Sequence, residues 1–164
     1  MARESVGVVD WPRIEEAIVA AVVATEVPPR RMASPVTGKP SFEEEMIEPA
    51  IRAVIDVIRN RVKAPRFPNS ATEVVLWPRQ FSAVGREEYF AKAAAGKWFP
   101  QHVERCAQLW REEWPDTTSG SLFYWSPVRM EPPGRSPAWA DAMDKYVVPG
   151  IGSWWFTFAR PRTP

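Results

Sequence analysis

Residues 50–62, "AIRAVIDVIRNRV", carry apolar side chains at intervals of three and four positions. This spacing is typical of an α-helix with one apolar side. The residues on that side are Ile51, Val54, Ile55, Ile58 and Val62. A side so strongly apolar predicts a helix that packs into the core of a globular domain.

Helix signals also precede this stretch. Asp10 can cap a helix with Pro12 in its first turn, and a Pro-Pro pair requires this helix to end by about Val27. Residues 41–44, "SFEE", form a capping box that predicts the start of the helix containing residues 50–62. Pro49 lies inside that helix, so we expect a kink or a new helix start there.

The rest of the chain predicts shorter elements. They are a helix or a strand at 71–76, helices at 86–95, 100–114 and 137–146, a turn at 115–120, and strands at 121–126 and 153–158. We find no internal repeat. This order of many helices and few short strands predicts a single domain of the α+β class.

Composition excludes several kinds of site. The 164 residues include one cysteine, Cys106, and one histidine, His102, so an internal disulfide and a histidine-rich metal site are excluded. We interpret Cys106 as a core residue on the apolar side of a helix. No nucleotide-binding motif is present, and the net charge of +1 favours neither nucleic acid nor an anionic membrane as partner.

The sequence also bears on localisation. No stretch has the length of a membrane span, and the N-terminus has no apolar region of the signal-peptide type. We therefore expect a protein made in the cytoplasm without a cleaved signal peptide and without membrane insertion.

Glu26 is the most informative carboxylate. It follows Val22 by four positions and Ile18 by eight, near the border of the apolar side, and it lies in the last turn, where the helix dipole disfavours negative charge. Both effects favour a protonated carboxyl group, which a general acid needs for glycosidic cleavage. The alternative is an ordinary ion pair with Arg30 or Arg31.

Several stretches, taken in order, resemble the SleB-type cell wall hydrolases, which include spore cortex-lytic enzymes and related bacterial and phage lysins. The matching stretches are "AAVVATE" (20–26), "AIRAVIDVIRNRV" (50–62), "FPNSATEVVLWPRQFSAV" (67–84), "DTTSGSLFYW" (116–125) and "PAWA" (137–140). Each stretch alone is weakly specific, but five in order are fairly specific. Together they cover about residues 17–158.

The resemblance implies a predominantly helical, lysozyme-like or lytic-transglycosylase-like domain at 10–158 with a small antiparallel β-sheet. Residues 1–9 would be an N-terminal arm and 159–164 a tail. The implied activity is cleavage of peptidoglycan glycan strands between N-acetylmuramic acid and N-acetylglucosamine, with Glu26 as the one catalytic carboxyl group and no metal or organic cofactor. The implied substrate-binding residues are Gln80, Ser82, Tyr124 and Trp139.

Two departures from the family pattern leave alternatives open. The family glutamate normally stands in a Gly-Glu-Ala-Arg-Gly context close to the second helix, whereas here residues 28–41 resemble an insertion. Without that insertion, Glu43 or Glu44 would hold the family position. The family often closes with Gly-x-His-x-Phe, but Trp154 replaces this histidine. A catalytically degenerate structural, virion or assembly protein is therefore the alternative function.

The setting follows from the expected absence of a signal peptide. A phage lysin released through holin pores would reach the cell wall. A virion protein that opens the wall during DNA delivery would also reach it, and its partners would be phage virion proteins.

A lone glutamate favours a lytic transglycosylase over a two-carboxylate hydrolase. One histidine and one core cysteine disfavour an amidase or peptidase.

Overall fold

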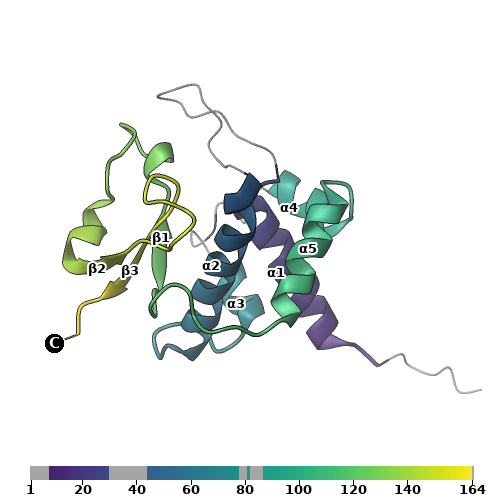
Figure 1. Cartoon of the computed structure of the whole chain (residues 1–164). Coiled ribbons are helices and arrows are strands. Elements are labelled where there is room, and N and C mark those ends of the chain that lie inside the picture. The colour runs from purple at the N-terminus through teal and green to yellow at the C-terminus, as the bar shows by residue number, and fades with distance from the viewer. Residues whose placement is uncertain (1–7, 30–43, 78–80, 82–86, 164) are drawn as a thin grey trace, which may run out of the picture.

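The computed structural model describes residues 8–29, 44–77, 81 and 87–163. The helices are α1 (Trp11–Glu26), α2 (Glu44–Lys63), α3 (Ala71–Leu76), α4 (Glu87–Ala94) and α5 (Pro100–Arg111). The strands are β1 (Phe123–Trp125), β2 (Met143–Tyr146) and β3 (Thr157–Pro161), with the 3-10 helices η2 (Pro127–Arg129) and η3 (Ala138–Ala142). The α-helices gather on one side of the molecule and the strands on the other, which confirms the α+β class (Figure 1).

Helix α1 begins and ends as the sequence predicts. The Asp10 carboxylate accepts a hydrogen bond from the Arg13 backbone amide at 3.2 Å, which caps the first turn. The helix ends at Glu26, and the Val27 amide still donates to the Val23 carbonyl at 2.9 Å. Its second half is almost entirely buried, because α3, α4 and α5 all pack against it.

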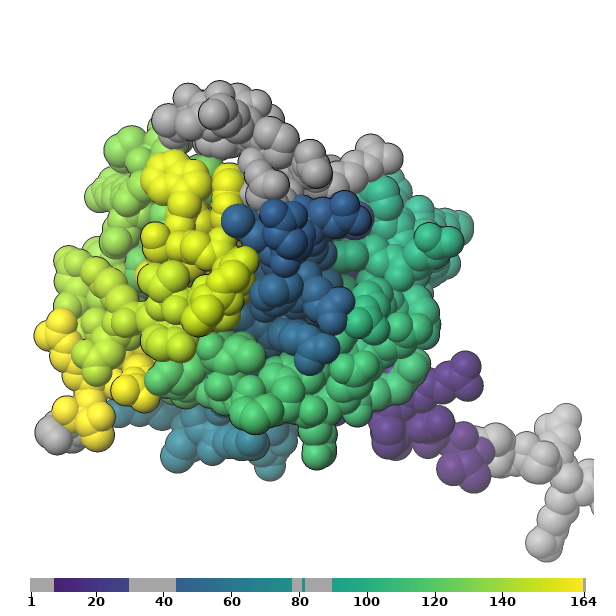
Figure 2. Space-filling model, in the orientation of Figure 1, coloured from purple at the N-terminus to yellow at the C-terminus, as the bar shows by residue number. Residues whose placement is uncertain are grey.

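Helix α2 is one continuous helix. Pro49 lies inside it, so the alternative of a new helix start at this proline is wrong. The apolar side identified in residues 50–62 is buried as predicted, with Ile51, Val54 and Ile58 each at most 1% exposed. The start of α2 lies beside the C-terminal segment on the face shown in Figure 2, and a Cβ atom added at Gly150 would stand 3.9 Å from Pro49 Cγ.

Within the described residues, the strands form an antiparallel sheet in the order β1-β3-β2. Tyr124 of β1 and Tyr146 of β2 both pair with Phe158 of β3. Side chains alternate across the sheet, so Tyr124 and Phe158 lie on one face, and Phe123 and Trp125 lie on the other, where Trp125 is buried against Ala140.

Some predicted elements differ from the structure. The helix predicted at 137–146 is instead η3 followed by β2, because pairing with β3 overrides a weak local pattern. The closing strand predicted at 153–158 is β3 at Thr157–Pro161, which extends past the expected domain boundary at residue 158. The helix predicted at 100–114 ends at Arg111.

The early end of α5 has a physical cause. Trp114 precedes a proline, which disfavours helical backbone at that residue. The Arg59 guanidinium donates to the carbonyls of Trp110 at 2.9 Å and Glu112 at 2.6 Å. These bonds tie the chain to α2 as it leaves the helix.

The core joins both layers. Phe156 and Phe158 of the sheet layer are 3% and 0% exposed and belong to the same buried cluster as α1, α2, α3 and α5. Cys106 is fully buried, as predicted, and burial raises the pKa of its thiol to about 12. Across the part of the chain described, none of the helices combines the length and the apolar character that a membrane span requires.

Candidate active site

Glu26 and Tyr124 meet in the structure although 98 positions separate them in the sequence. The Tyr124 hydroxyl donates a hydrogen bond to Glu26 Oε2 at 2.9 Å, and Glu26 is only 7% exposed. A hydrogen bond donated to a carboxylate is stronger than one between neutral groups. The carboxyl group predicted to be catalytic is therefore enclosed and oriented by a specific partner.

The aromatic packing around Tyr124 explains its position. The ring centroid of Tyr124 lies 5.2 Å from that of Phe156, 5.7 Å from that of Phe158 and 6.4 Å from that of Phe81. Burial raises the pKa of Tyr124 well above its ordinary value, and the negative charge of Glu26 acts in the same direction. Tyr124 therefore keeps its proton and acts as a hydrogen-bond donor to Glu26.

The end of α1 that carries Glu26 is held by His102 of α5. Its Nε2 lies 2.6 Å from the Val27 carbonyl oxygen, so Nε2 donates to that carbonyl. Burial lowers the pKa of His102, and its contacts with the carbonyls of Val27 and Ala24 act in the opposite direction. The lone histidine of the sequence thus positions the helix end beside the candidate catalytic residue.

The turn at 116–120, which the sequence also predicts, is built around Asp116. Its Oδ1 accepts from the amide and hydroxyl of Thr118 at 2.8 Å and 2.7 Å, and its Oδ2 accepts from the Gly120 amide at 2.6 Å. Gly120 has φ of 74°, which favours glycine at this position. Burial would raise the pKa of Asp116, but these bonds and one from Asn60 lower it. Asp116 is therefore an ionised structural acceptor.

Helix α2 fixes the same turn through residues that sequence reasoning did not assign to it. Asp56 Oδ2 accepts from Trp114 Nε1 at 3.1 Å and from the amide and hydroxyl of Thr117 at 2.9 Å and 2.7 Å. Asn60, one helical turn later, donates to Asp116 Oδ2 and to the Ser121 carbonyl, both at 3.1 Å. In the sequence, the only sign of this role was the i, i+4 spacing of Asp56 and Asn60 within an otherwise apolar helix face.

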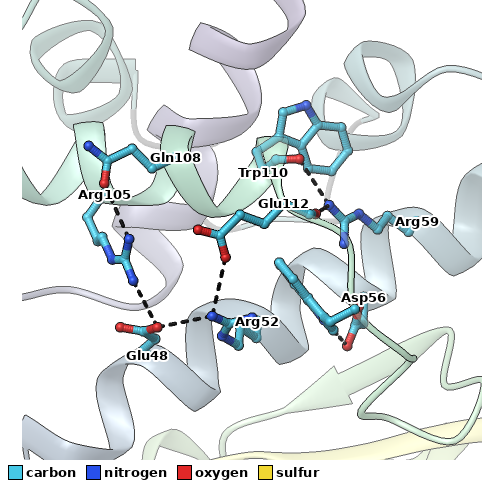
Figure 3. A network of polar contacts seen from close by, with 9 residues as sticks. Glu48, Arg52, Asp56, Arg59, Arg105, Gln108, Trp110 and Glu112 are labelled. Carbon is cyan, nitrogen blue, oxygen red and sulfur yellow. Dashed lines mark hydrogen bonds and ion pairs between the residues drawn. The ribbon is translucent and has the colours of Figure 1, made fainter.

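A polar network joins α2 to α5 on the surface (Figure 3). Glu48 accepts from Arg52 at 3.2 Å and from Arg105 at 2.9 Å, and Arg52 also contacts Glu112 at 3.4 Å. These carboxylates are paired and partly exposed, which is typical of surface ion pairs. We assign the network to the packing of the two helices.

The other predicted site residues differ in their placement. Gln80 and Ser82 lie outside the described residues, and so does Glu43; Glu44 is exposed at the start of α2. Phe81, between Gln80 and Ser82, is 3% exposed and belongs to the core.

Trp139 does not join Glu26. Its ring centroid is 5.6 Å from those of both Phe123 and Trp125, which lie on the face of the sheet opposite Tyr124. The role of Trp139 as a substrate-binding residue stays a prediction.

Among the described residues, no group of three or more His, Cys, Asp or Glu side chains is arranged to hold a metal ion. The contacts of Glu26 instead offer proton transfer. An enclosed carboxyl group held by a hydroxyl donor can give a proton and take one back.

Comparisons with known proteins place this geometry in context. The family model for cell wall hydrolases matches residues 48–157, a region that contains Tyr124 and begins after Glu26. The catalytic domain of the Bacillus cereus SleB protein is 20% identical, with a TM-score of 0.55, over 97% of this chain and 98% of that chain. The catalytic domain of the germination-specific lytic transglycosylase SleB from Bacillus anthracis is 18% identical, with a TM-score of 0.53, over 97% and 100%. No curated protein matches the chain.

Proposed function

The chain belongs to the cell wall hydrolase family, and from this premise we propose that it cleaves peptidoglycan glycan strands between N-acetylmuramic acid and N-acetylglucosamine. The observation that supports this proposal is the enclosed Glu26 carboxyl group with the Tyr124 hydroxyl on one oxygen. Membership of the family confirms the resemblance predicted from the sequence and assigns the cell wall as the site of action.

Glu26 is the proposed general acid and general base. Its proton passes to the glycosidic oxygen as the bond from that oxygen to C1 of the muramoyl residue breaks. The resulting carboxylate then takes the proton of the 6-hydroxyl group as O6 bonds to C1. The product is a 1,6-anhydro sugar, Glu26 recovers its proton, and no water is consumed. Tyr124 stabilises the carboxylate between the two transfers through its hydrogen bond.

The state of the neighbouring aspartates supports a lytic transglycosylase over a hydrolase with two carboxylates. Such a hydrolase needs a second free carboxylate across the sugar ring. Asp56 and Asp116 both accept several hydrogen bonds from groups of the chain that hold the 114–121 loop. Both carboxylates are therefore engaged as structural acceptors.

The proposal also includes residues that contact the sugar substrate. Gln80 and Ser82 flank Phe81, whose ring packs 6.4 Å from that of Tyr124, and we retain them as contacts for sugar acetamido and hydroxyl groups. We also retain Trp139, which packs against Phe123 and Trp125, as a contact for an apolar sugar face. Action in phage lysis or during phage DNA delivery stays a prediction.

The test is a digest of purified peptidoglycan by the wild type and by Glu26→Gln, with products identified by mass spectrometry. We expect anhydro-muropeptides from the wild type. We expect a rate lower by about 10²–10⁴-fold in Glu26→Gln, because the glutamine amide has no proton that it can transfer to the glycosidic oxygen. Glu44→Gln is the matched control and tests the alternative glutamate, which is exposed.

The other outcomes each have a meaning. Products with reducing ends that still require Glu26 would identify a muramidase. Loss of activity in Glu44→Gln and not in Glu26→Gln would transfer the role to Glu44. Absence of activity in every variant, the wild type included, would favour the structural protein.

A further inference from the structure

Four aromatic side chains form a continuous row that joins the loop after α2 to the sheet. The ring centroids of Trp77 and Phe67 are 6.2 Å apart, those of Phe67 and Phe123 are 5.9 Å apart, and those of Phe123 and Trp139 are 5.6 Å apart. We call these four residues the aromatic row. They come from the end of α3, the loop after α2, β1 and η3, so the row exists only in the folded chain.

The two ends of the aromatic row are open to solvent. Trp77 is 40% exposed and Trp139 is 43% exposed, while Phe67 and Phe123 between them are half-buried. A single exposed apolar residue is ordinary, but a contiguous exposed group marks a surface that binds something. The row is therefore a candidate surface for a ligand with apolar faces.

The two phenylalanines of the row also line a cavity of about 550 Å³. Ligand sites have volumes of about 300–1,000 Å³ and mostly apolar walls with a few polar groups. Arg66 is the one charged side chain among the described residues that line this cavity. In the same part of the chain no salt bridge includes Arg66, so its exposed guanidinium group can donate hydrogen bonds to a ligand.

Arg61 of α2 holds the inner rings of the row from their buried side. Its side chain is 3% exposed, and its guanidinium carbon lies 5.2 Å from the Phe67 ring centroid and 5.7 Å from that of Phe123. These distances are typical of cation–π contacts. Its Nε also donates to the Leu122 carbonyl at 2.7 Å, directly before Phe123 in the chain. The rings are therefore fixed before a ligand arrives, which lowers the cost of binding.

We propose that the aromatic row and Arg66 bind a glycan strand of peptidoglycan at sugar units other than the pair that is cleaved. This inference rests on the proposed function for the identity of its ligand, and it extends the sugar contact retained for Trp139 to Trp77 and Arg66. Phe123 lies on the face of the sheet opposite Tyr124, so the row is separated from the hydrogen bond between Tyr124 and Glu26.

The chemistry of the surface matches an acetylated amino sugar. Pyranose rings carry C–H groups that pack on aromatic rings, and the exposed rings of Trp77 and Trp139 offer such contacts at both ends of the row. The acetamido carbonyl accepts hydrogen bonds, which the Arg66 guanidinium can donate. A glycan strand is a polymer, so an enzyme that cleaves it also meets the sugars on either side of the scissile bond.

The first experiment measures the binding of the N-acetylglucosamine tetramer, which has no charge and no peptide, by isothermal titration calorimetry. All proteins carry Glu26→Gln, so that cleavage does not interfere. Trp77→Ala and Trp139→Ala should each weaken binding by about tenfold, because each removes an exposed stacking ring. Trp11→Ala is the matched control, since Trp11 is an exposed tryptophan at the start of α1, outside the row, and this variant should bind as its parent does.

The second experiment locates the bound sugar. Nitrogen-15 NMR follows the indole N–H signals of Trp77 and Trp139, which are assigned by their loss in Trp77→Phe and Trp139→Phe. Adding the tetramer should shift both signals and leave the signal of Trp11 in place. The titration is carried out on a protein with an intact row, so it tests the proposal even if an alanine variant does not fold.

The outcomes separate this proposal from the proposed catalysis. Unmoved indole signals, or unchanged binding in both folded alanine variants, would overturn the glycan site even if the enzyme cleaves peptidoglycan. Sugar bound at the row of a protein that cleaves nothing would support the glycan site and contradict only the catalysis. Binding of purified stem peptide in place of the tetramer would overturn the proposal in favour of a peptide site. Self-association that Trp77→Ala abolishes, without tetramer binding, would assign the surface to a second copy of the chain.

Discussion

Tyr124 shows how a side chain placed for packing also serves the chemistry. Its ring is held by Phe156 and Phe158 from the sheet layer, while its hydroxyl reaches the end of α1. The rings fix the hydroxyl before substrate arrives, so orientation of Glu26 requires no rearrangement.

Tyr124→Phe should leave the fold intact and lower kcat by about 10- to 100-fold, because a hydrogen bond to a charged group contributes about 1.5–3 kcal/mol. Steady-state cleavage of solubilised glycan strands measures the effect. Tyr146→Phe, at an exposed position on β2, is the matched control and should retain wild-type rates. Full activity in Tyr124→Phe would show that Glu26 does not depend on this donor.

At the residue scale the sequence reasoning predicted Glu26 and Tyr124 as neighbouring site residues, and the structure adds the hydrogen bond that joins them. Helical spacing placed Glu26 at the border of a buried side, and the resemblance supplied Tyr124. The spacing could not show that Trp139 packs against Phe123 and Trp125, since these contacts join residues of different elements. A strand's alternation becomes informative only when its partners are known.

At the element scale, the end of α1 is the feature on which the site depends. The His102 side chain from α5 contacts the carbonyl that follows Glu26. Because burial lowers the pKa of His102, the folded protein favours the neutral ring. His102 takes up a proton below about pH 6.5 in the unfolded chain, but only at lower pH in the folded protein. The contribution of the neutral His102 ring to the free energy of unfolding is therefore present above about pH 6.5 and is lost as the pH falls.

His102→Gln should therefore lose less stability on acidification than the wild type. Between about pH 7.5 and about pH 5 we expect a difference of the order of 1 kcal/mol in the free energy of unfolding, measured by urea denaturation. The sequence has one histidine, so the comparison reports on His102 alone. Equal losses in the two proteins would show that folding does not lower the pKa of His102.

Elements with strong periodic patterns were predicted well. Helices α1 and α2 follow from caps and apolar spacing, and the six residues of α3 resolve as a helix where periodicity allowed two structures. The wrong prediction at 137–146 concerned residues whose conformation depends on β3, a strand that follows later in the chain. Strand pairing between distant residues leaves little trace in local sequence.

At the scale of the whole molecule, one buried cluster unites the helical side with the sheet. Phe158 is fully buried in this cluster and pairs with both neighbouring strands. The sheet therefore stabilises the site by packing as well as by carrying Tyr124.

Phe158→Ala should destabilise the protein by about 3–5 kcal/mol, because it leaves a cavity where both layers meet. Urea unfolding followed by tryptophan fluorescence and by far-UV circular dichroism should give coincident transitions. Tyr146→Ala removes an exposed aromatic ring opposite Phe158 and should cost far less. Two separate transitions would mean that the layers unfold independently.

The amino-acid pattern was sufficient for the class of fold, the main helices, the buried Cys106 and the family, because these depend on local periodicity and on ordered motifs along the chain. The hydrogen bond between Tyr124 and Glu26, the histidine at the helix end and the packing of Trp139 against Phe123 and Trp125 required the folded structure. Each of these depends on contacts between residues far apart in sequence, and such contacts are fixed by packing and strand register.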